Sequence, residues 1–123
     1  MVAIRVQRGY MGRMDIEIAA RRLAELGNPT RLQIVRMLVQ AGGDGLAIGE
    51  LQAGLGVPAS TLAFHLRGLV TAGLVEQEKQ GRTVRCTIDS HAINATLAFV
   101  KENCCAGFST AEPATLRRAS TAR

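Results

Sequence analysis

Two short helical segments separated by a tight turn constrain the fold of this chain most strongly. The first segment lies near Ile48–Leu55 and the second covers residues 60–72, with the turn Gly56-Val57-Pro58-Ala59 between them. Ser60 is the expected N-cap of the second segment and Gly73 ends it. Its inner face is predicted to hold Leu62, Leu66, Leu69 and Val70. Short helices joined by a glycine-containing turn are typical of a helix-turn-helix motif.

A β-hairpin is predicted directly after this motif. The strands cover residues 74–79 and 82–88 and meet at a Gln80-Gly81 turn. Alternation places Val84, Cys86 and Ile88 on one face of the second strand and Thr83 and Arg85 on the other. Because the hairpin follows a helix-turn-helix, it is interpreted as a wing, and the fold class is mainly α with a small β-hairpin.

Further helices flank the motif on both sides. Asp15 is expected to cap a helix that ends before Gly27, and Pro29 to begin another, whose buried stripe is predicted as Leu32, Val35, Leu38 and Val39. A last helix is expected from Ser90 to about Cys105, capped by Asp89 or Ser90. These elements make one domain over residues 14–106, preceded by a basic extension (1–13) and followed by a tail (107–123) that is predicted to be disordered.

The charge of the chain favours a polyanionic partner. Its 15 Lys and Arg residues outnumber its 10 Asp and Glu residues, which gives a net charge of +5. Such an excess points to nucleic acid first. No apolar run approaches the roughly 20 residues needed to span a bilayer, and no signal-peptide pattern is present. We therefore expect a cytoplasmic protein without a membrane partner.

Several stretches resemble the ArsR-type repressors, which are bacterial metal and metalloid sensors. They are LGNPTRL at 26–32, GEL at 49–51, STLAFHLRGL at 60–69, and AGLV at 72–75 with Gly81-Arg82. The resemblance covers about residues 15–105. It implies a symmetric winged-helix homodimer that pairs through its first and last helices. Such a dimer would bind double-stranded operator DNA with an inverted-repeat sequence.

The second helix of the motif is the expected recognition helix. Its DNA-binding candidates are Ser60, Thr61, His65 and Arg67, and the wing adds Lys79, Arg82 and Arg85. The alternative for His65 is a surface or inter-helix hydrogen bond, and the alternative for the wing is an ordinary solvated charge cluster. Phe64 lies either outside, near a thymine methyl group, or under the wing.

The three cysteines, Cys86, Cys104 and Cys105, are the candidate metal ligands, and no obligatory cofactor is expected. Soft thiolates select soft ions. Family members with a Cys-Cys pair at this helix end resemble arsenite sensors, which implies trivalent arsenic or antimony as the effector. Several members carry a further cysteine downstream, and this chain has none. The third thiol is therefore Cys86, reached across the dimer, or the site has two thiols; a buried structural pair is the alternative.

Other functions are conceivable for the same residues. Asp89-Ser90-His91 resembles the start of a zinc site in the family, which Glu102 and Cys105 would complete. Thiol oxidation is a second alternative, with Cys86 and Cys104 as the more favourable disulfide pair because adjacent cysteines need a strained backbone. An enzyme is not expected, since the two histidines lie in no recognisable nucleophile motif.

Overall fold

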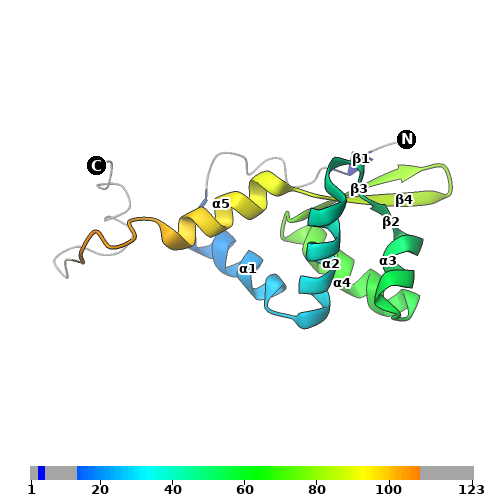
Figure 1. Ribbon diagram of the computed structural model, residues 1–123, viewed down its shortest axis with the longest axis horizontal. Coiled ribbons are helices and arrows are strands. Elements are labelled where there is room, and N and C mark those ends of the chain that lie inside the picture. The colour runs from blue at the N-terminus through cyan, green and yellow to red at the C-terminus, as the bar shows by residue number, and fades with distance from the viewer. Residues whose placement is uncertain (1–2, 5–13, 109–123) are drawn as a thin grey trace.

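The computed structural model describes residues 3–4 and 14–108 (Figure 1). Its helices are α1 (Ile16–Leu26), α2 (Pro29–Ala41), α3 (Ile48–Leu55), α4 (Ala59–Thr71) and α5 (Ser90–Lys101), with a short 3-10 turn at Gly42–Asp44. Its strands are β1 (Ala3–Ile4), β2 (Leu46–Ala47), β3 (Val75–Gln80) and β4 (Thr83–Ile88). The predicted fold class is confirmed. Most of the predicted N-terminal extension and of the predicted tail lies outside the described residues.

Side-chain caps explain where three of the helices begin. Oδ1 atoms of Asp15, Asn28 and Asp89 accept backbone N–H bonds of 2.9–3.0 Å at the starts of α1, α2 and α5. The predicted cap at Ser60 is wrong. Because Pro58 has an extended backbone (φ −62°, ψ 153°), α4 begins one residue earlier, at Ala59, without a side-chain cap. The Ser60 hydroxyl therefore stays exposed on the first turn.

The sheet is antiparallel, with the strand order β1-β3-β4-β2. Gln80 pairs with Thr83, so the hairpin turn is Gly81-Arg82, one residue beyond the predicted Gln80-Gly81 turn. Gly81 has φ +65°, a conformation that glycine adopts without strain. The shift places Arg82 at the tip of the wing.

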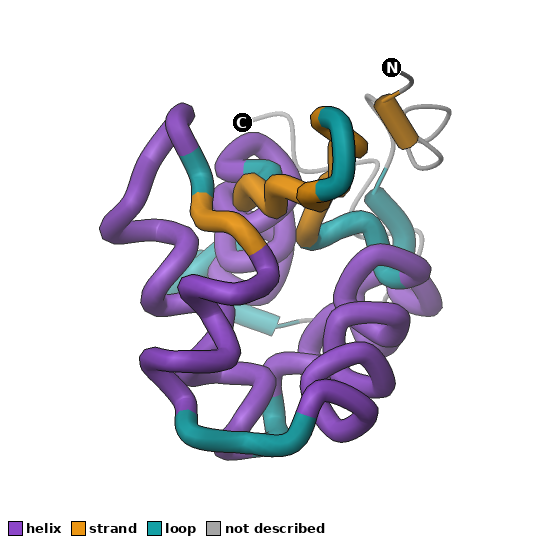
Figure 2. The backbone as a smooth tube through the Cα atoms, turned by 90° about the vertical axis from the view of Figure 1, so that its right-hand side faces the viewer, coloured by secondary structure: helices purple, strands orange, loops and turns teal. Residues whose placement is uncertain are grey.

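The core is aliphatic and lies between the helices and the sheet. Figure 2 shows the helices gathered below and on both sides of the strands. The α2 stripe differs in part from the prediction: Ile34, Val35 and Leu38 are buried, whereas Leu32 and Val39 are exposed. Helix α2 contacts α1, α3, α4 and β4. Its buried face is therefore centred on Ile34 and Leu38 rather than on Leu32 and Val39. The rest of the buried aliphatic core includes Leu51, Leu62, Leu66, Leu69, Leu74 and Val75.

Helices α1 and α5 pack against each other at one end of the molecule, away from α3 and the wing (Figure 1). Between them lies Arg22 of α1, which is only 6% exposed. Its Nε donates to the carbonyl of Ala72 (2.9 Å), and its Nη1 donates to Thr96 Oγ1 (3.5 Å). Arg22 therefore connects α5 to the end of α4. Among the described residues, no helix is long and apolar enough to cross a bilayer.

Candidate DNA-binding surface and thiol site

Helix α4 presents a continuous exposed ridge to solvent. Ser60, Phe64 and Arg67 are exposed, and they recur at the spacing of one helical face. Thr61 and His65 lie beside them and are half-buried. Of the two positions considered for Phe64, the outer one is observed. The opposite face of α4 holds the buried leucines, so this ridge is free to meet a partner.

His65 makes the inter-helix contact that was one of the two alternatives for it. Its Nδ1 lies 3.2 Å from Nη1 of Arg31 on α2. The Phe64 ring packs edge-on against the imidazole, with ring centroids 5.4 Å apart. This contact engages one nitrogen of the ring, so a DNA contact through the other nitrogen stays a prediction.

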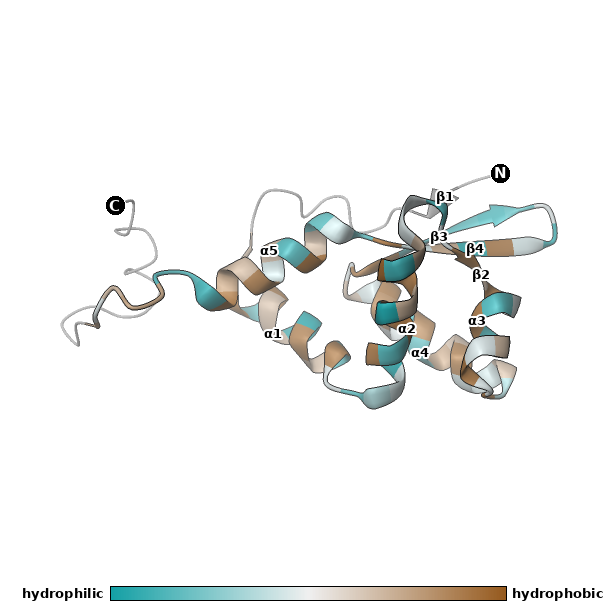
Figure 3. Ribbon diagram, viewed as in Figure 1, coloured by the Kyte–Doolittle hydropathy of each residue, from teal (hydrophilic) through white to brown (hydrophobic). Residues whose placement is uncertain are grey.

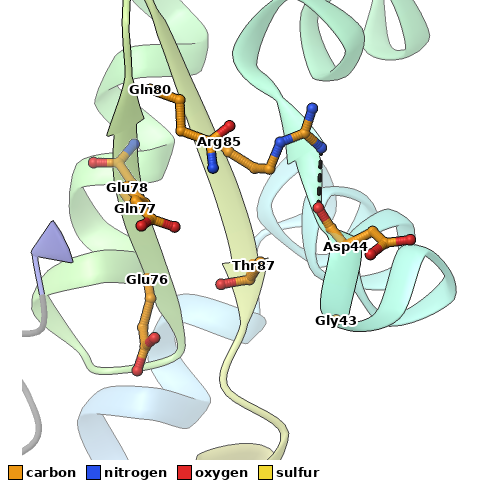
Figure 4. A pocket seen from close by; sticks show the side chains of 8 residues that line it. All are labelled: Gly43, Asp44, Glu76, Gln77, Glu78, Gln80, Arg85 and Thr87. Atoms are coloured by element: carbon orange, nitrogen blue, oxygen red, sulfur yellow. Dashed lines mark hydrogen bonds between the residues drawn. The ribbon is translucent and has the colours of Figure 1, made fainter. Parts of the chain in front are cut away.

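The wing separates into a basic tip and an acidic outer face. Lys79 and Arg82 are exposed at the tip. Arg85 instead reaches back to the loop before β2, where its Nη1 donates to the carbonyls of Asp44 (3.0 Å) and Gly45 (3.3 Å) (Figure 4). Arg85 also lines a polar groove together with Gly43, Asp44, Glu76, Gln77, Glu78, Gln80 and Thr87. The carboxylates of this groove disfavour a DNA phosphate there, so the tip is the better candidate.

Cys104 and Cys105 lie beyond α5, in the turn that ends it. The predicted helix to about Cys105 is too long: α5 ends at Lys101, Glu102 is extended, and Asn103 has φ +65°. Asparagine tolerates this left-handed conformation better than most residues. Cys105 also has φ +65°, and the turn is closed by a 2.9 Å bond from the Cys104 N–H to the Lys101 carbonyl.

This turn brings the two thiols together in solvent. The Sγ atoms of Cys104 and Cys105 are 3.2 Å apart, and both residues are exposed. The alternative of a buried structural pair is therefore wrong. Two accessible sulfur atoms at this separation can bond to one soft ion.

Cys86 lies in a different environment. It is fully buried on β4, and Gln77 Nε2 contacts its Sγ at 3.7 Å. Burial raises the pKa of the Cys86 thiol, an effect that the Gln77 hydrogen bond and the Arg85 charge only partly oppose. Cys86 therefore points inward from the wing, on the same face of β4 as Val84 and Ile88. Within one chain, the wing and the end of α5 lie far apart (Figure 1).

Comparisons with known proteins identify the family. Residues 26–78 match a family described as a helix-turn-helix domain. The HTH-type transcriptional regulator YgaV of Escherichia coli is 33% identical over 89 residues, which cover 72% of this chain and 88% of YgaV. The structure of HlyU from Vibrio cholerae superposes with a TM-score of 0.59 at 32% identity, over 75% of this chain and 99% of HlyU. An ArsR-like transcriptional regulator from Rhodococcus gives 0.61 at 29% identity, over 69% and 77%.

The chain belongs to the ArsR-type winged-helix transcriptional regulators. The relatives are transcription regulators by name, and the chain is accordingly a DNA-binding regulator. In this ArsR-type chain, α4 is the second helix of the helix-turn-helix motif and β3-β4 is the wing. The effector and the residues that bind it are not fixed by the family.

The zinc alternative uses residues from both ends of α5. Asp89 accepts the capping bond at the start of the helix, whereas Glu102 and Cys105 follow its end. His91 is exposed on the first turn. Among the described residues, one chain gathers no group of three or more His, Cys, Asp or Glu residues that could hold a metal ion. This site therefore needs two subunits and stays a prediction.

Two arginines with inter-helix contacts, Arg22 and Arg31, were not predicted from the sequence. Arg22 was not identified, because a charged residue in an amphipathic helix is normally placed on the solvent side. Arg31 belonged to a stretch that resembles the family, but its contact with His65 joins positions 34 residues apart. Only Arg22 could have been found from the sequence. It lies three residues after Ala19, so the two residues share one face of α1, and Ala19 was expected to be apolar and inward.

Proposed function

We propose that this chain is a homodimeric repressor that leaves its operator when Cys104 and Cys105 bind a trivalent arsenical or antimonial. The observation that carries the proposal is the 3.2 Å separation of two exposed sulfur atoms in the turn after α5. Trivalent arsenic bonds strongly to sulfur, so a pair of convergent thiols selects it over harder ions.

The binding step is a ligand exchange that needs no oxidant. With methylarsenite, two S–H bonds and two As–OH bonds break, two As–S bonds form, and two water molecules leave. Inorganic arsenite bound in the same way would keep one hydroxyl. The two-thiol form of the site is favoured here because Cys86 is buried and its raised pKa keeps the thiol protonated.

The homodimer is supported by exposed apolar side chains on α1 and α5, two helices whose ribbons carry many hydrophobic positions (Figure 3). Ile16 and Leu23 of α1 are exposed, and so are Leu97 and Val100 of α5. Exposed apolar patches of this kind mark association surfaces. Pairing these helices across a two-fold axis would place two recognition helices about 34 Å apart, one turn of DNA.

A route from the thiols to the DNA surface is part of the proposal. The turn with the two cysteines continues α5, and Thr96 of α5 accepts a bond from Arg22, which also binds the carbonyl of Ala72 at the end of α4. An arsenical bridging both sulfurs would reorder the last turn of α5 and, through Arg22, move α4. The ligand shifts the equilibrium only by its differential affinity for the two arrangements.

Native mass spectrometry of the reduced chain with methylarsenite tests the site directly. We expect one arsenic per chain with loss of two water molecules, no such adduct in Cys104→Ser or Cys105→Ser, and an unchanged adduct in Cys86→Ser. An adduct that needs Cys86 would contradict the two-thiol site and support the intersubunit one.

The second candidate is a thiol redox response at the same pair. It is supported by the likeness to HlyU, for which a structure is described as reduced, and by the contact between the two sulfur atoms. An oxidant such as a peroxide would take two electrons and two protons from the Cys104 and Cys105 thiols to form an S–S bond. The Cys86–Cys104 disulfide that the sequence favoured would have to join two subunits, because the wing and the end of α5 lie far apart within one chain (Figure 1). Loss of DNA binding on peroxide treatment, with no effect of methylarsenite, would favour this candidate.

A further inference from the structure

The His65 imidazole is held in one tautomeric state by its neighbour. Its Nδ1 lies 3.2 Å from Arg31 Nη1. A guanidinium has only donors, so Nδ1 must accept and cannot carry a proton in this contact. The neutral ring then carries its proton on Nε2. Within the described part of the chain, no hydrogen bond to Nε2 is found.

Arg31 is itself fixed in place, so it can orient the ring. Its Nε donates to the Glu25 carbonyl at 2.9 Å and lies 3.0 Å from the Glu25 carboxylate. Its backbone N–H is bound by the Asn28 cap of α2. On the other side, the Phe64 ring packs against the imidazole at an interplanar angle of 66°. The ring is thus restrained both at Nδ1 and at its edge.

We propose that Arg31 is a positioning residue for DNA recognition, which holds His65 as the Nε2–H tautomer so that α4 offers a fixed donor to a phosphate oxygen of the DNA backbone. The assignment rests on the binding of DNA by α4. The acceptor is a phosphate because His65 is half-buried on the side of α4 next to α2, whereas Ser60, Phe64 and Arg67 form the exposed ridge. Phosphate contacts position a recognition helix on the duplex, whereas base edges are contacted by the side chains that enter the groove.

The tautomer can be measured without DNA. The chain has only two histidines, and His91 is exposed on α5, so it provides an internal reference. In ¹⁵N NMR spectra of the imidazoles at neutral to mildly alkaline pH, we expect a pure Nε2–H signature for His65. Arg31→Gln should convert it to a tautomer mixture, whereas Arg36→Gln, which removes an exposed charge from the same helix, should not. A mixture or an Nδ1–H ring in the wild-type chain would overturn the proposal.

Two substitutions of His65 test the donor while Arg31 stays intact. The glutamine amide reaches the position of Nε2, and the shorter asparagine amide reaches that of Nδ1. We therefore expect His65→Gln to keep DNA affinity and His65→Asn to lose about tenfold or more, as for a hydrogen bond to a charged group. The probes are a duplex selected by the wild-type chain from a random pool and an unselected duplex. Equal loss in both variants would overturn the assignment.

The comparison of the two duplexes tests the acceptor. A phosphate contact predicts the same fold loss for His65→Asn on both, with an unchanged salt dependence because the neutral ring releases no counterion. Loss confined to the selected duplex would show a base contact and contradict the phosphate assignment. If the wild-type chain binds neither duplex, the DNA-binding function fails, and the NMR experiment alone decides whether Arg31 sets the tautomer.

Discussion

At the scale of the residue, the three cysteines divide into an exposed pair and a buried single thiol. The exposed pair is created by backbone geometry, since Asn103 and Cys105 both have φ +65°. Cys86 is 0% exposed, and this burial raises the pKa of its thiol. The residue types alone predicted a soft-ion site. They could not predict which thiols share it, because that depends on where α5 ends.

The raised pKa of Cys86 predicts a pH-dependent stability. In the folded chain the thiol stays protonated at pH values where the unfolded thiol ionises, so its contribution is complete below the ordinary cysteine pKa and is lost as pH rises above it. Relative to Cys86→Val, the wild-type free energy of unfolding should fall by up to about 1.4 kcal/mol per pH unit above that point. Denaturant titrations of both reduced proteins at pH 7 and pH 10 check this. Parallel pH profiles would contradict it.

At the scale of the element, the sequence predicted the five helices and the two wing strands, but it missed the short strands β1 and β2 and did not predict how the elements pack. Asp15 and Asp89 were found as caps because a cap bonds to residues three positions away. The end of α5 and the start of α4 were misplaced, since they depend on single backbone conformations at Asn103 and Pro58. The contact of Arg22 with Ala72 spans 50 residues, and no local pattern encodes it.

Arg22 is expected to stabilise the junction of α1, α4 and α5. Arg22→Met keeps much of the side-chain volume but leaves the Ala72 carbonyl without this donor, which should cost about 1–3 kcal/mol of unfolding free energy. Thermal or denaturant unfolding measures this, with Arg21→Met on the exposed side of the same helix as the control. If Arg22 also carries the signal, the variant should still bind methylarsenite but release DNA incompletely. Full release with normal affinity would exclude Arg22 from the route.

Replacing arginine by glutamine should change DNA binding at the tip of the wing (Arg82) but protein stability on its outer face (Arg85). Arg82→Gln at the exposed tip should reduce the slope of log K against log salt for DNA binding by about 0.9 for each phosphate that the side chain neutralises. Arg85→Gln should lower thermal stability instead, because it removes the bonds to the Asp44 and Gly45 carbonyls. DNA titrations at several salt concentrations, with melting curves, separate the two. A reduced salt slope in Arg85→Gln would return Arg85 to the DNA surface.

At the scale of the whole molecule, one half of the chain carries the candidate DNA surface, and the other half carries Cys104, Cys105 and the exposed apolar side chains of α1 and α5. Helices α3 and α4 with the wing form the first half, and α1 and α5 form the second (Figure 1). A signal at the end of α5 must therefore cross the chain or act through the arrangement of two subunits. The fold class could be predicted from the sequence because periodicity and turns specify it. The separation of the two surfaces could not, because it depends on the packing of α1 against α5.

Dimerisation through α5 predicts a contrast between two nearby positions. Val100 belongs to the exposed apolar patch and is 57% exposed, whereas exposed Ala98 lies on nearly the opposite side of the helix. Val100→Glu should shift the chain toward a monomer in analytical ultracentrifugation and weaken DNA binding, because a charge would be buried between subunits. Ala98→Glu should remain dimeric. Dimers of unchanged stability in Val100→Glu would place the interface elsewhere.

Release of DNA by an arsenical tests the central claim most directly. Fluorescence anisotropy of a labelled selected duplex, bound to the reduced chain, is followed during a titration with methylarsenite. We predict release in the wild-type chain and in Cys86→Ser, and none in Cys104→Ser or Cys105→Ser. Retained DNA in the wild-type chain, or release that persists when Cys104 and Cys105 are both replaced by serine, would contradict the assignment of this exposed pair as the sensor.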